Sequence, residues 1–376
     1  MSREAAIEFV WQLAEAVNAH DTRRLLSFYA NEVVTVSPVF GEVAGKAAIE
    51  RSWDEIFSLF PDWVVRVTDV LVDGNRIVFL GTAGGTDQKG WFGQPATGDR
   101  IEYRAAIVLT MNQGKIVRDE RIYDLTGVLQ RLEKARLDKE LAMAAEVQRA
   151  LLSRTRERTE YCEAAGDSFP CRAIGGDFFE LLRLPSGDFA VALGDVSGKG
   201  PASAILAAMI QGMLAVELQT GSNPSTILSR LNRSLVERKL EPRFVTLVYG
   251  VLSPTGRFAY SNAGHNSPLM LSRNGLRRLN VGGPILGVFS GTVFEEETVC
   301  LTEGDTVIMY SDGVTEARDP HGREFGEDSL LSSVTAYALS SAPDILRGIL
   351  RRVQDFCQNA AQTDDISVTV TRFHGL

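Results

Sequence analysis

The sequence predicts an α+β protein with two folded halves joined by a long helix. The 376 residues exceed the length of a typical single domain, so we expect at least two hydrophobic cores. Amphipathic helical stretches and alternating β runs both occur along the chain, and short glycine-containing turns separate neighbouring β runs. Such turns form hairpins, which pair strands in antiparallel order. We therefore expect antiparallel sheets packed with helices and not a doubly wound parallel sheet.

The N-terminal part, residues 1–126, is expected to pack helices on a curved, largely antiparallel sheet. The turns Asp73-Gly74 and Asn112-Gln113-Gly114 fit tight hairpins between β-like runs. The expected helices cover residues 6–17, 23–29 and 47–60, and the expected strands cover residues 63–72, 76–84, 101–111 and 115–123.

A helical connection is expected over residues 127–155. The stretch is charged, rich in Ala and Leu and free of Pro, a composition that favours helix. Five of its positions follow the 4,3,4,3 spacing of a coiled-coil seam. Two interpretations remain open: the helix pairs with a second copy to form a homodimer, or it packs on its own domain. The seam positions are Leu137, Leu141, Ala144, Gln148 and Leu151.

Charge and composition limit the partners of the chain. The formal net charge of -9 argues against nucleic acid and against an anionic membrane surface, since both need a basic field. We find no run of about 20 apolar residues that would span a bilayer and no signal peptide at the start of the chain. The four cysteines show no CxxC pairing, so we expect reduced thiols and a cytoplasmic protein.

Among the aspartates of residues 156–376, four lie at the same kind of place, the junction of an apolar β run and a glycine-rich or polar turn. Phe189, Val191 and Leu193 alternate in a strand that delivers one of them to its tip. Another follows the apolar run 307–310. The four residues are Asp177, Asp195, Asp312 and Asp364.

Converging carboxylates without a cation would repel one another and raise one another's pKa, so such a cluster indicates bound metal. Oxygen ligands and a chain with 4 His favour Mg²⁺ or Mn²⁺ over zinc. Two such ions can activate a water for in-line attack on phosphorus. We find no nucleophile elbow, Walker loop or kinase signature, which agrees with chemistry that needs no protein nucleophile.

At these residues the chain resembles the metal-dependent protein phosphatase (PPM) family, in the bacterial branch typified by the stage II sporulation phosphatase and the regulators of stress sigma factors. The resemblance covers residues 140–372. It rests on Gly-Gly-Asp at 175–177, Asp-Val-Ser-Gly-Lys-Gly at 195–200, Arg-Phe-Val-Thr-Leu at 243–247, Asn-Ala-Gly-His-Asn-Ser-Pro at 262–268, Ser-Asp-Gly-Val-Thr-Glu at 311–316 and Thr-Asp-Asp-Ile-Ser at 363–367.

The resemblance implies an α-β-β-α sandwich of two antiparallel sheets with two metal ions at one edge. Asp195 is expected to bridge both ions with the Val196 carbonyl nearby, and Asp177 to serve one ion. The expected metal set is Asp177, Asp195, Val196, Asp312, Asp364 and Asp365. Members of this branch dephosphorylate serine or threonine on an anti-anti-sigma protein, which is the implied substrate.

Three other residues of this half were weighed for catalysis. His265 could act as an acid, although its Asn-Ala-Gly-His turn favours a structural hydrogen-bonding role. Arg172 and Lys199 could replace the phosphate-binding arginine of eukaryotic relatives, but we expect ordinary surface cations.

The first half resembles the SnoaL-like branch of the nuclear transport factor 2-like fold, a cone-shaped α+β barrel around an apolar pocket. The resemblance rests on the N-terminal helix, on Phe92-Gly93-Gln94-Pro95-Ala96-Thr97-Gly98 and on Ile122-Tyr123-Asp124-Leu125-Thr126-Gly127. It implies a domain that senses a small ligand or forms a dimer. Some relatives are cyclases that use an aspartate, and Asp124 is the candidate for that place. The interpretation we favour for Asp124 is a capping or turn role.

Together these features predict a Mg/Mn-dependent protein serine/threonine phosphatase regulated by its N-terminal domain. Two alternatives stay open. The C-terminal half could be a non-catalytic regulator that binds a phosphoprotein, or the N-terminal half could be a small-molecule isomerase or cyclase.

Overall fold

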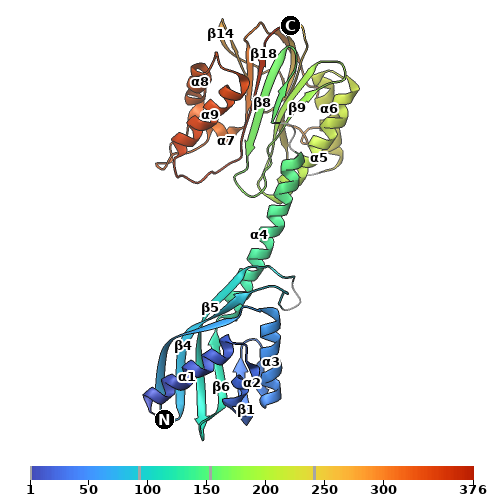
Figure 1. Cartoon of the computed structure of the whole chain (residues 1–376). Helices are drawn as coiled ribbons and strands as arrows, with labels where there is room; N and C mark the ends of the chain where they lie inside the picture. The colour runs from blue at the N-terminus through green and yellow to red at the C-terminus, as the bar shows by residue number, and fades with distance from the viewer. Residues whose placement is uncertain (1, 92–94, 152–154, 240–242) are drawn as a thin grey trace. The chain divides into compact units, whose positions relative to one another are not determined.

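The structure is a computed structural model that describes residues 2–91, 95–151, 155–239 and 243–376 (Figure 1). The chain divides into two compact units, Met1–Glu140 and Leu141–Leu376. Both combine helices with sheets, which confirms the α+β class. Residues 92–94 of the Phe92–Gly98 motif, and 152–154 of the expected connection, lie outside the described residues.

The first unit is a curved six-stranded sheet covered by helices. Its strand order is β2-β1-β6-β5-β4-β3, with β1 parallel to β6 and every other neighbouring pair antiparallel. The aromatic side chains of Trp53, Phe60 and Trp63 lie in the core between sheet and helices. The elements are α1 (Arg3–Asn18), α2 (Thr22–Ser27), β1 (Tyr29–Ser37), β2 (Gly41–Ala44), α3 (Lys46–Leu59), β3 (Val64–Asp73), β4 (Arg76–Thr86), β5 (Arg100–Asn112) and β6 (Lys115–Tyr123).

Two strands of this sheet, β1 and β2, were not predicted from the sequence. The helix expected to reach residue 29 ends at Ser27, and Tyr29 begins β1. The inward positions of β1 include Thr35 and Ser37, so its hydrophobic alternation is weak. In addition, β1 pairs in parallel with β6 from the other end of the unit, and such a pairing leaves no hairpin signal in the sequence.

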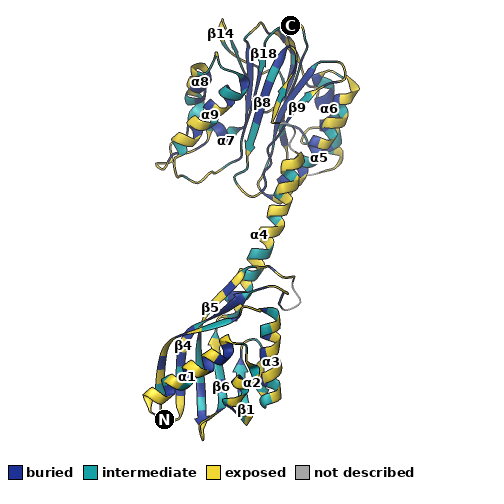
Figure 2. Cartoon of the chain, in the orientation of Figure 1, coloured by how far each residue is buried: buried dark blue, intermediate teal, exposed yellow. Residues whose placement is uncertain are grey.

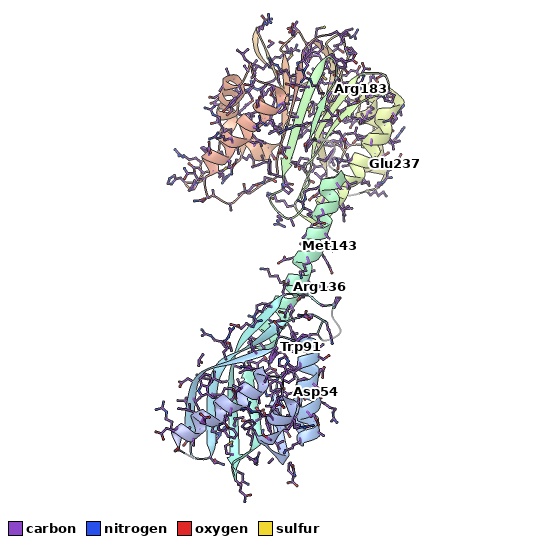
Figure 3. The ribbon with its side chains drawn as sticks, viewed as in Figure 1. Asp54, Trp91, Arg136, Met143, Arg183 and Glu237 are labelled. Atoms are coloured by element: carbon purple, nitrogen blue, oxygen red, sulfur yellow. The ribbon has the colours of Figure 1, made fainter. Side chains whose placement is uncertain are left out.

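Helix α4 (Leu125–Leu151) begins in the first unit and ends in the second. The Asp124 carboxylate accepts a hydrogen bond from the Gly127 N–H at 2.9 Å, which satisfies a free donor of the first turn. Val128 is buried, whereas Met143 is 68% exposed (Figure 3) and the seam residue Leu151 is 51% exposed. Most of the helix is coloured as exposed or intermediate in Figure 2.

The second unit contains two six-stranded sheets packed face to face, with helices on both outer faces (Figure 1). One sheet pairs β15-β12-β11-β10-β9 with β16 beside β12, and the other pairs β14-β13-β17-β18-β8-β7. The first sheet comprises β9 (Phe178–Arg183), β10 (Phe189–Val196), β11 (Val245–Leu252), β12 (Arg257–Ala263), β15 (Gly282–Gly283) and β16 (Glu297–Cys300). The second comprises β7 (Arg156–Arg158), β8 (Cys162–Phe169), β13 (Leu269–Ser272), β14 (Gly275–Arg278), β17 (Thr306–Tyr310) and β18 (Ile366–Phe373).

Three hydrophobic clusters hold these four layers together. Phe179, Phe258 and Met309 belong to the cluster between the sheets. A second cluster joins the first sheet to its helices, and a third joins the other sheet to its helices. This layering is the predicted α-β-β-α sandwich. The helices are α5 (Pro201–Glu217), α6 (Pro224–Glu237), α7 (Asp312–Thr315), α8 (Gly326–Ala336) and α9 (Ala342–Cys357), with a short 3-10 turn over Leu218–Thr220.

One sequence-based statement needs correction. Residues Pro201–Thr220 are long and apolar enough to cross a membrane by length and composition, although we found no such run in the sequence. Within the second unit α5 packs against β9 and β10, and Leu206, Ile210 and Leu214 are buried there. The apolar composition of this helix therefore serves the core of the sandwich.

Candidate metal centre

The four predicted aspartates meet at one edge of the sandwich because of strand direction. Asp177 directly precedes β9 and Asp195 lies near the end of β10, and these two strands are antiparallel neighbours. In the other sheet, Asp312 follows β17 and Asp364 precedes β18, again an antiparallel pair. The end of one strand lies beside the start of its antiparallel neighbour. Each sheet therefore brings two carboxylates to the same edge.

Asp365 joins the two sheets at this edge. Its Oδ1 accepts a hydrogen bond from the Cys171 N–H and its Oδ2 accepts one from the Gly176 N–H, both at 2.7 Å. The residue is 6% exposed. Both oxygens are thus engaged in holding the loop that carries Asp177, which is a positioning role. Asp365 stays a predicted ligand, but its oxygens face backbone donors.

The Gly-Gly-Asp motif needs glycine at its first two positions because other atoms of the site lie very close to both residues. A Cβ on Gly175 would lie 2.4 Å from Asp365 Oδ2, and a Cβ on Gly176 would lie 2.7 Å from the Val196 carbonyl oxygen. Real Cβ atoms do not approach so closely, so side chains at these two positions would push the loop away from the carboxylates. The motif lets Asp177 reach the strand that carries Asp195.

The electrostatics of the cluster are those of a cation site. Burial raises the pKa of Asp177 well above its usual range, and the nearby Asp195 charge raises it further. Burial, then the charges of Asp312 and Asp364, raise the pKa of Asp195 to about 7. Burial and the charge of Asp364 also raise the pKa of Asp312. The carboxylates of Asp177, Asp195 and Asp312 are therefore destabilised as anions by their surroundings.

One carboxylate oxygen of this cluster is without a hydrogen-bond partner. Asp177 is 5% exposed, and within the described part of the chain its Oδ2 finds no donor. A buried carboxylate oxygen without a donor is costly unless a cation neutralises it. The donor set, carboxylates with one buried backbone carbonyl at Val196, suits hard divalent ions such as Mg²⁺ and Mn²⁺. The residues present therefore fit the predicted metals.

Lys199 has a closer relation to the site than the sequence indicated. Its ammonium lies 2.9 Å from Asp364 Oδ2 and also donates to the Thr363 carbonyl oxygen. The hydrogen bond to Asp364 raises the pKa of Lys199, so the cation persists at neutral pH. We had expected an ordinary surface cation. Arg172 is exposed, as is Lys199.

His265 has the structural role that its turn suggested. It is 7% exposed, and its Nδ1 lies 2.8 Å from Thr246 Oγ1. Its backbone N–H donates to Asn262 Oδ1 at 2.7 Å, and its carbonyl oxygen accepts from the Asn262 amide at 2.9 Å. Burial lowers the pKa of His265 to about 4, so the ring is neutral at pH 7.

Gln148 contacts the site loop, which sequence reasoning did not foresee. Its Nε2 donates to the Gly175 carbonyl oxygen at 2.7 Å, and the Gly175 N–H donates to its Oε1 at 3.1 Å. The last turn of α4 is thereby joined to the loop that ends at Asp177. The sequence placed Gln148 in a coiled-coil seam, a pattern that cannot show side-chain contacts to a distant loop.

Comparison with known proteins agrees with this geometry. Residues 185–374, half of the chain, match the family described as stage II sporulation protein E (SpoIIE). The chain belongs to the SpoIIE family. Its second unit is therefore a protein phosphatase domain of the PPM type, and the resemblance stated from the motifs is confirmed. Residues 10–119 match the SnoaL-like domain, which confirms the resemblance of the first half.

Three individual proteins that this SpoIIE-family chain resembles are at most 28% identical to it over the aligned residues. Phosphoserine phosphatase RsbU of Bacillus subtilis is 28% identical over 254 residues, which cover 66% of this chain and 72% of RsbU. Protein IcfG of Synechocystis is 27% identical over 228 residues, 53% of this chain and 36% of IcfG. The SiaA-PP2C domain of Pseudomonas aeruginosa superimposes with a TM-score of 0.56 at 18% identity, covering 64% of this chain and 98% of that domain, which shows the shared fold.

Proposed function

We propose that this SpoIIE-family protein is a Mg²⁺- or Mn²⁺-dependent serine/threonine phosphatase that acts on a phosphorylated regulatory protein, of the anti-anti-sigma type, in the cytoplasm. The supporting observation is the meeting of Asp177, Asp195, Asp312 and Asp364 at one edge, with their charges uncompensated apart from Lys199 in the described residues. The relative named phosphoserine phosphatase RsbU supports the substrate class.

The residues of such a site have different roles, which depend on the sheet that carries each of them. When bound, two divalent ions supply the positive charge and the activated water that hydrolysis of a phosphate monoester needs. Asp195, with a pKa raised to about 7 by burial and by the charges of Asp312 and Asp364, is near carboxylates of the facing sheet and would help to hold the ions. Asp177 and the Val196 carbonyl lie on its own sheet, and Asp312 and Asp364 come from the facing sheet.

Turnover of p-nitrophenyl phosphate and of a phosphoserine peptide tests this proposal. We expect turnover with Mn²⁺, none with chelator, and none in Asp312→Asn. Asp328→Asn, an exposed aspartate on α8, is the matched control and should keep full activity. Activity that survives both chelator and Asp312→Asn would contradict the proposal. No turnover at all would favour a non-catalytic phosphoprotein-binding regulator, which the intact carboxylate set argues against.

We propose further that α4 transmits regulation to the metal centre. The two hydrogen bonds between Gln148 and Gly175 support this, since they tie the helix to the loop that carries Asp177. The exposed seam residues Leu137 and Leu151 also suit a homodimer through this helix. Deleting residues 1–125 should change either the specific activity or the oligomeric state. If the deletion changes neither, the coupling proposal fails.

The first unit is proposed to sense a small ligand in its apolar cavity of about 70 Å³. Among the described residues of this unit, Trp53 Nε1, Trp63 Nε1 and Asp119 Oδ1 are buried without a partner, and all three residues line the cavity. Asp119 is held by Arg121 at 2.9 Å and by the Tyr29 hydroxyl at 3.0 Å. Two free donors and one free acceptor in an apolar wall suit a hydroxylated, otherwise apolar molecule.

Tryptophan fluorescence tests ligand binding by this cavity. Phenol and cyclohexanol should shift the emission of the wild-type chain more than toluene does, and Trp63→Phe should reduce the shift. Equal responses to all three compounds would contradict the proposed hydroxyl contact. The isomerase or cyclase alternative has less support, because Asp124 caps α4 and is not among the cavity-lining residues.

A further inference from the structure

A second cavity of about 300 Å³ lies directly beside the carboxylate cluster in the phosphatase unit. Gly313 and Asp364 belong to its wall, so the cavity and the metal centre share residues. The two are in close contact: a Cβ on Gly313 would lie 2.1 Å from the Asp365 carbonyl oxygen and 3.3 Å from Asp364 Cβ. The volume is at the lower end of the range for ligand pockets, roughly 300–1,000 Å³, and suits one or two side chains.

The wall of this cavity is mainly apolar. Helix α9 contributes Leu350, Val353 and Cys357, and the segment after it contributes Ala361. Phe169, at the end of β8, is 44% exposed although it is large and apolar. Large apolar side chains that remain exposed next to a catalytic site are typical of surfaces that a partner covers.

The charged groups of the wall are already paired. The Arg318 guanidinium lies 2.8 Å from Glu324, and Asp364 is paired with Lys199. Gln362 donates from its Nε2 to the carbonyl oxygens of Phe169 and Asp364, each at 2.7 Å, which ties the rim to the site. An occupant with a charge of its own would find no free counter-charge among these wall residues. A neutral, apolar occupant is therefore favoured.

We infer that this cavity receives an apolar side chain of the substrate phosphoprotein, close in sequence to the phosphorylated serine or threonine. The inference rests on the proposed phosphatase function. A phosphoserine that reaches the carboxylates brings its neighbours with it, and three residues of extended chain span about 10 Å. Because the cavity shares its wall with the site, a flanking side chain within that reach can enter it. The flanking side chain in the pocket then makes the phosphatase selective for the sequence around the phosphoserine.

The experiment uses the full-length chain and synthetic phosphoserine peptides. The host peptide consists of Gly and Ser around one central phosphoserine, and a single Leu is placed at each position from three before to three after it. We expect one or two Leu positions to raise kcat/KM at least about fivefold over the host peptide, the factor that about 1 kcal/mol of side-chain burial provides. p-Nitrophenyl phosphate, which has no flanking residues, serves as the reference substrate.

Filling the cavity should remove that preference. Ala361 is exposed on the wall, so Ala361→Phe places a ring in the cavity without disturbing the core. We expect the preferred Leu peptide to lose its advantage, mainly through KM, while turnover of p-nitrophenyl phosphate stays unchanged. Ala336→Phe on α8 is the matched control, since Ala336 is exposed and not part of the wall. Ala360→Leu gives a second, smaller filling variant.

The outcomes separate this inference from the proposed function. Turnover of p-nitrophenyl phosphate and of every peptide at one common kcat/KM, with no effect of Leu, would overturn the pocket and leave the phosphatase standing. A Leu preference that persists in both filling variants would also overturn it, as would a change in oligomeric state caused by the filling variants, because a second copy would then occupy the cavity. No turnover of any substrate would refute the phosphatase itself.

Discussion

Replacing Asp365 by Asn tests whether this residue positions the site loop or binds metal. The carboxylate accepts N–H groups from Cys171 and Gly176, both at 2.7 Å, in a buried setting. Asn keeps one acceptor and turns an NH₂ group toward the other donor. A hydrogen bond to a charged group contributes about 1.5–3 kcal/mol. We expect Asp365→Asn to lower the free energy of unfolding of the phosphatase unit by about 2–3 kcal/mol, even with chelator present.

Urea unfolding in chelator measures this loss unit by unit. All four tryptophans, Trp11, Trp53, Trp63 and Trp91, lie in the first unit, so their fluorescence follows that unit alone. Far-UV circular dichroism follows both units, and the part of its unfolding signal that the fluorescence does not report should shift by about 1 M urea for a slope of about 2–3 kcal/mol/M. The fluorescence transition should not move, which provides an internal control.

Asp364→Asn is the matched comparison. Asp364 is 35% exposed and paired with Lys199 at 2.9 Å, and such exposed pairs contribute about 0–1 kcal/mol. We expect Asp364→Asn to leave stability in chelator nearly unchanged and to abolish the added stability that Mn²⁺ provides. If Asp365→Asn behaves in the same way, Asp365 is a metal ligand and the positioning role is refuted.

Three further predictions follow from the same geometry. Gln148→Ala removes two hydrogen bonds to Gly175, together about 1–3 kcal/mol, so the Mn²⁺ concentration for half-maximal activity should rise about 5- to 150-fold. Glu146→Ala, exposed on the same helix, should not raise it. Gly313→Ala places a Cβ 2.1 Å from the Asp365 carbonyl oxygen, so kcat should fall about 100-fold with the fold retained by circular dichroism; unchanged kcat would exclude this clash. The pKa of Asp195 is raised to about 7 in the fold, so between about pH 4 and 7 the folded, metal-free protein binds one proton more than the unfolded chain. The free energy of unfolding therefore falls as pH rises through that window. Asp195→Asn should flatten this part of the stability profile, and a profile identical to wild type would contradict the assignment.

His265 contributes to the same profile with the opposite sign. Its pKa is lowered to about 4, so the unfolded chain binds the extra proton between pH 4 and its ordinary value near 6.5, and stability rises with pH there. The wild-type curve alone therefore does not isolate Asp195. The difference between wild type and Asp195→Asn removes the His265 contribution, which is common to both, and reports Asp195 together with its effect on the pKa of Asp177.

The sequence by itself determined the chemistry of this protein. The aspartates proposed as ligands lie at strand ends, and three of them, Asp177, Asp195 and Asp312, lie beside glycines. A cluster of carboxylates needs strands that deliver the side chains, and at Asp177 and Asp312 it also needs backbone that approaches closely. Both requirements are local, so Gly175-Gly176-Asp177 and Asp312-Gly313 could be found without a structure. Turn chemistry predicted antiparallel sheets, and the resemblance to the PPM family implied their α-β-β-α layering.

Only the tertiary structure decided which groups touch across the sheets. The clamp of Asp365 on the Gly176 N–H, the pairing of Lys199 with Asp364 and the contact of Gln148 with Gly175 each join residues far apart in the chain. Strand β1 was missed for the same reason, since its parallel partner β6 comes from the far end of the unit. Spacing and hydrophobic period record a residue's local environment, whereas these contacts depend on how distant segments pack, which no local pattern encodes.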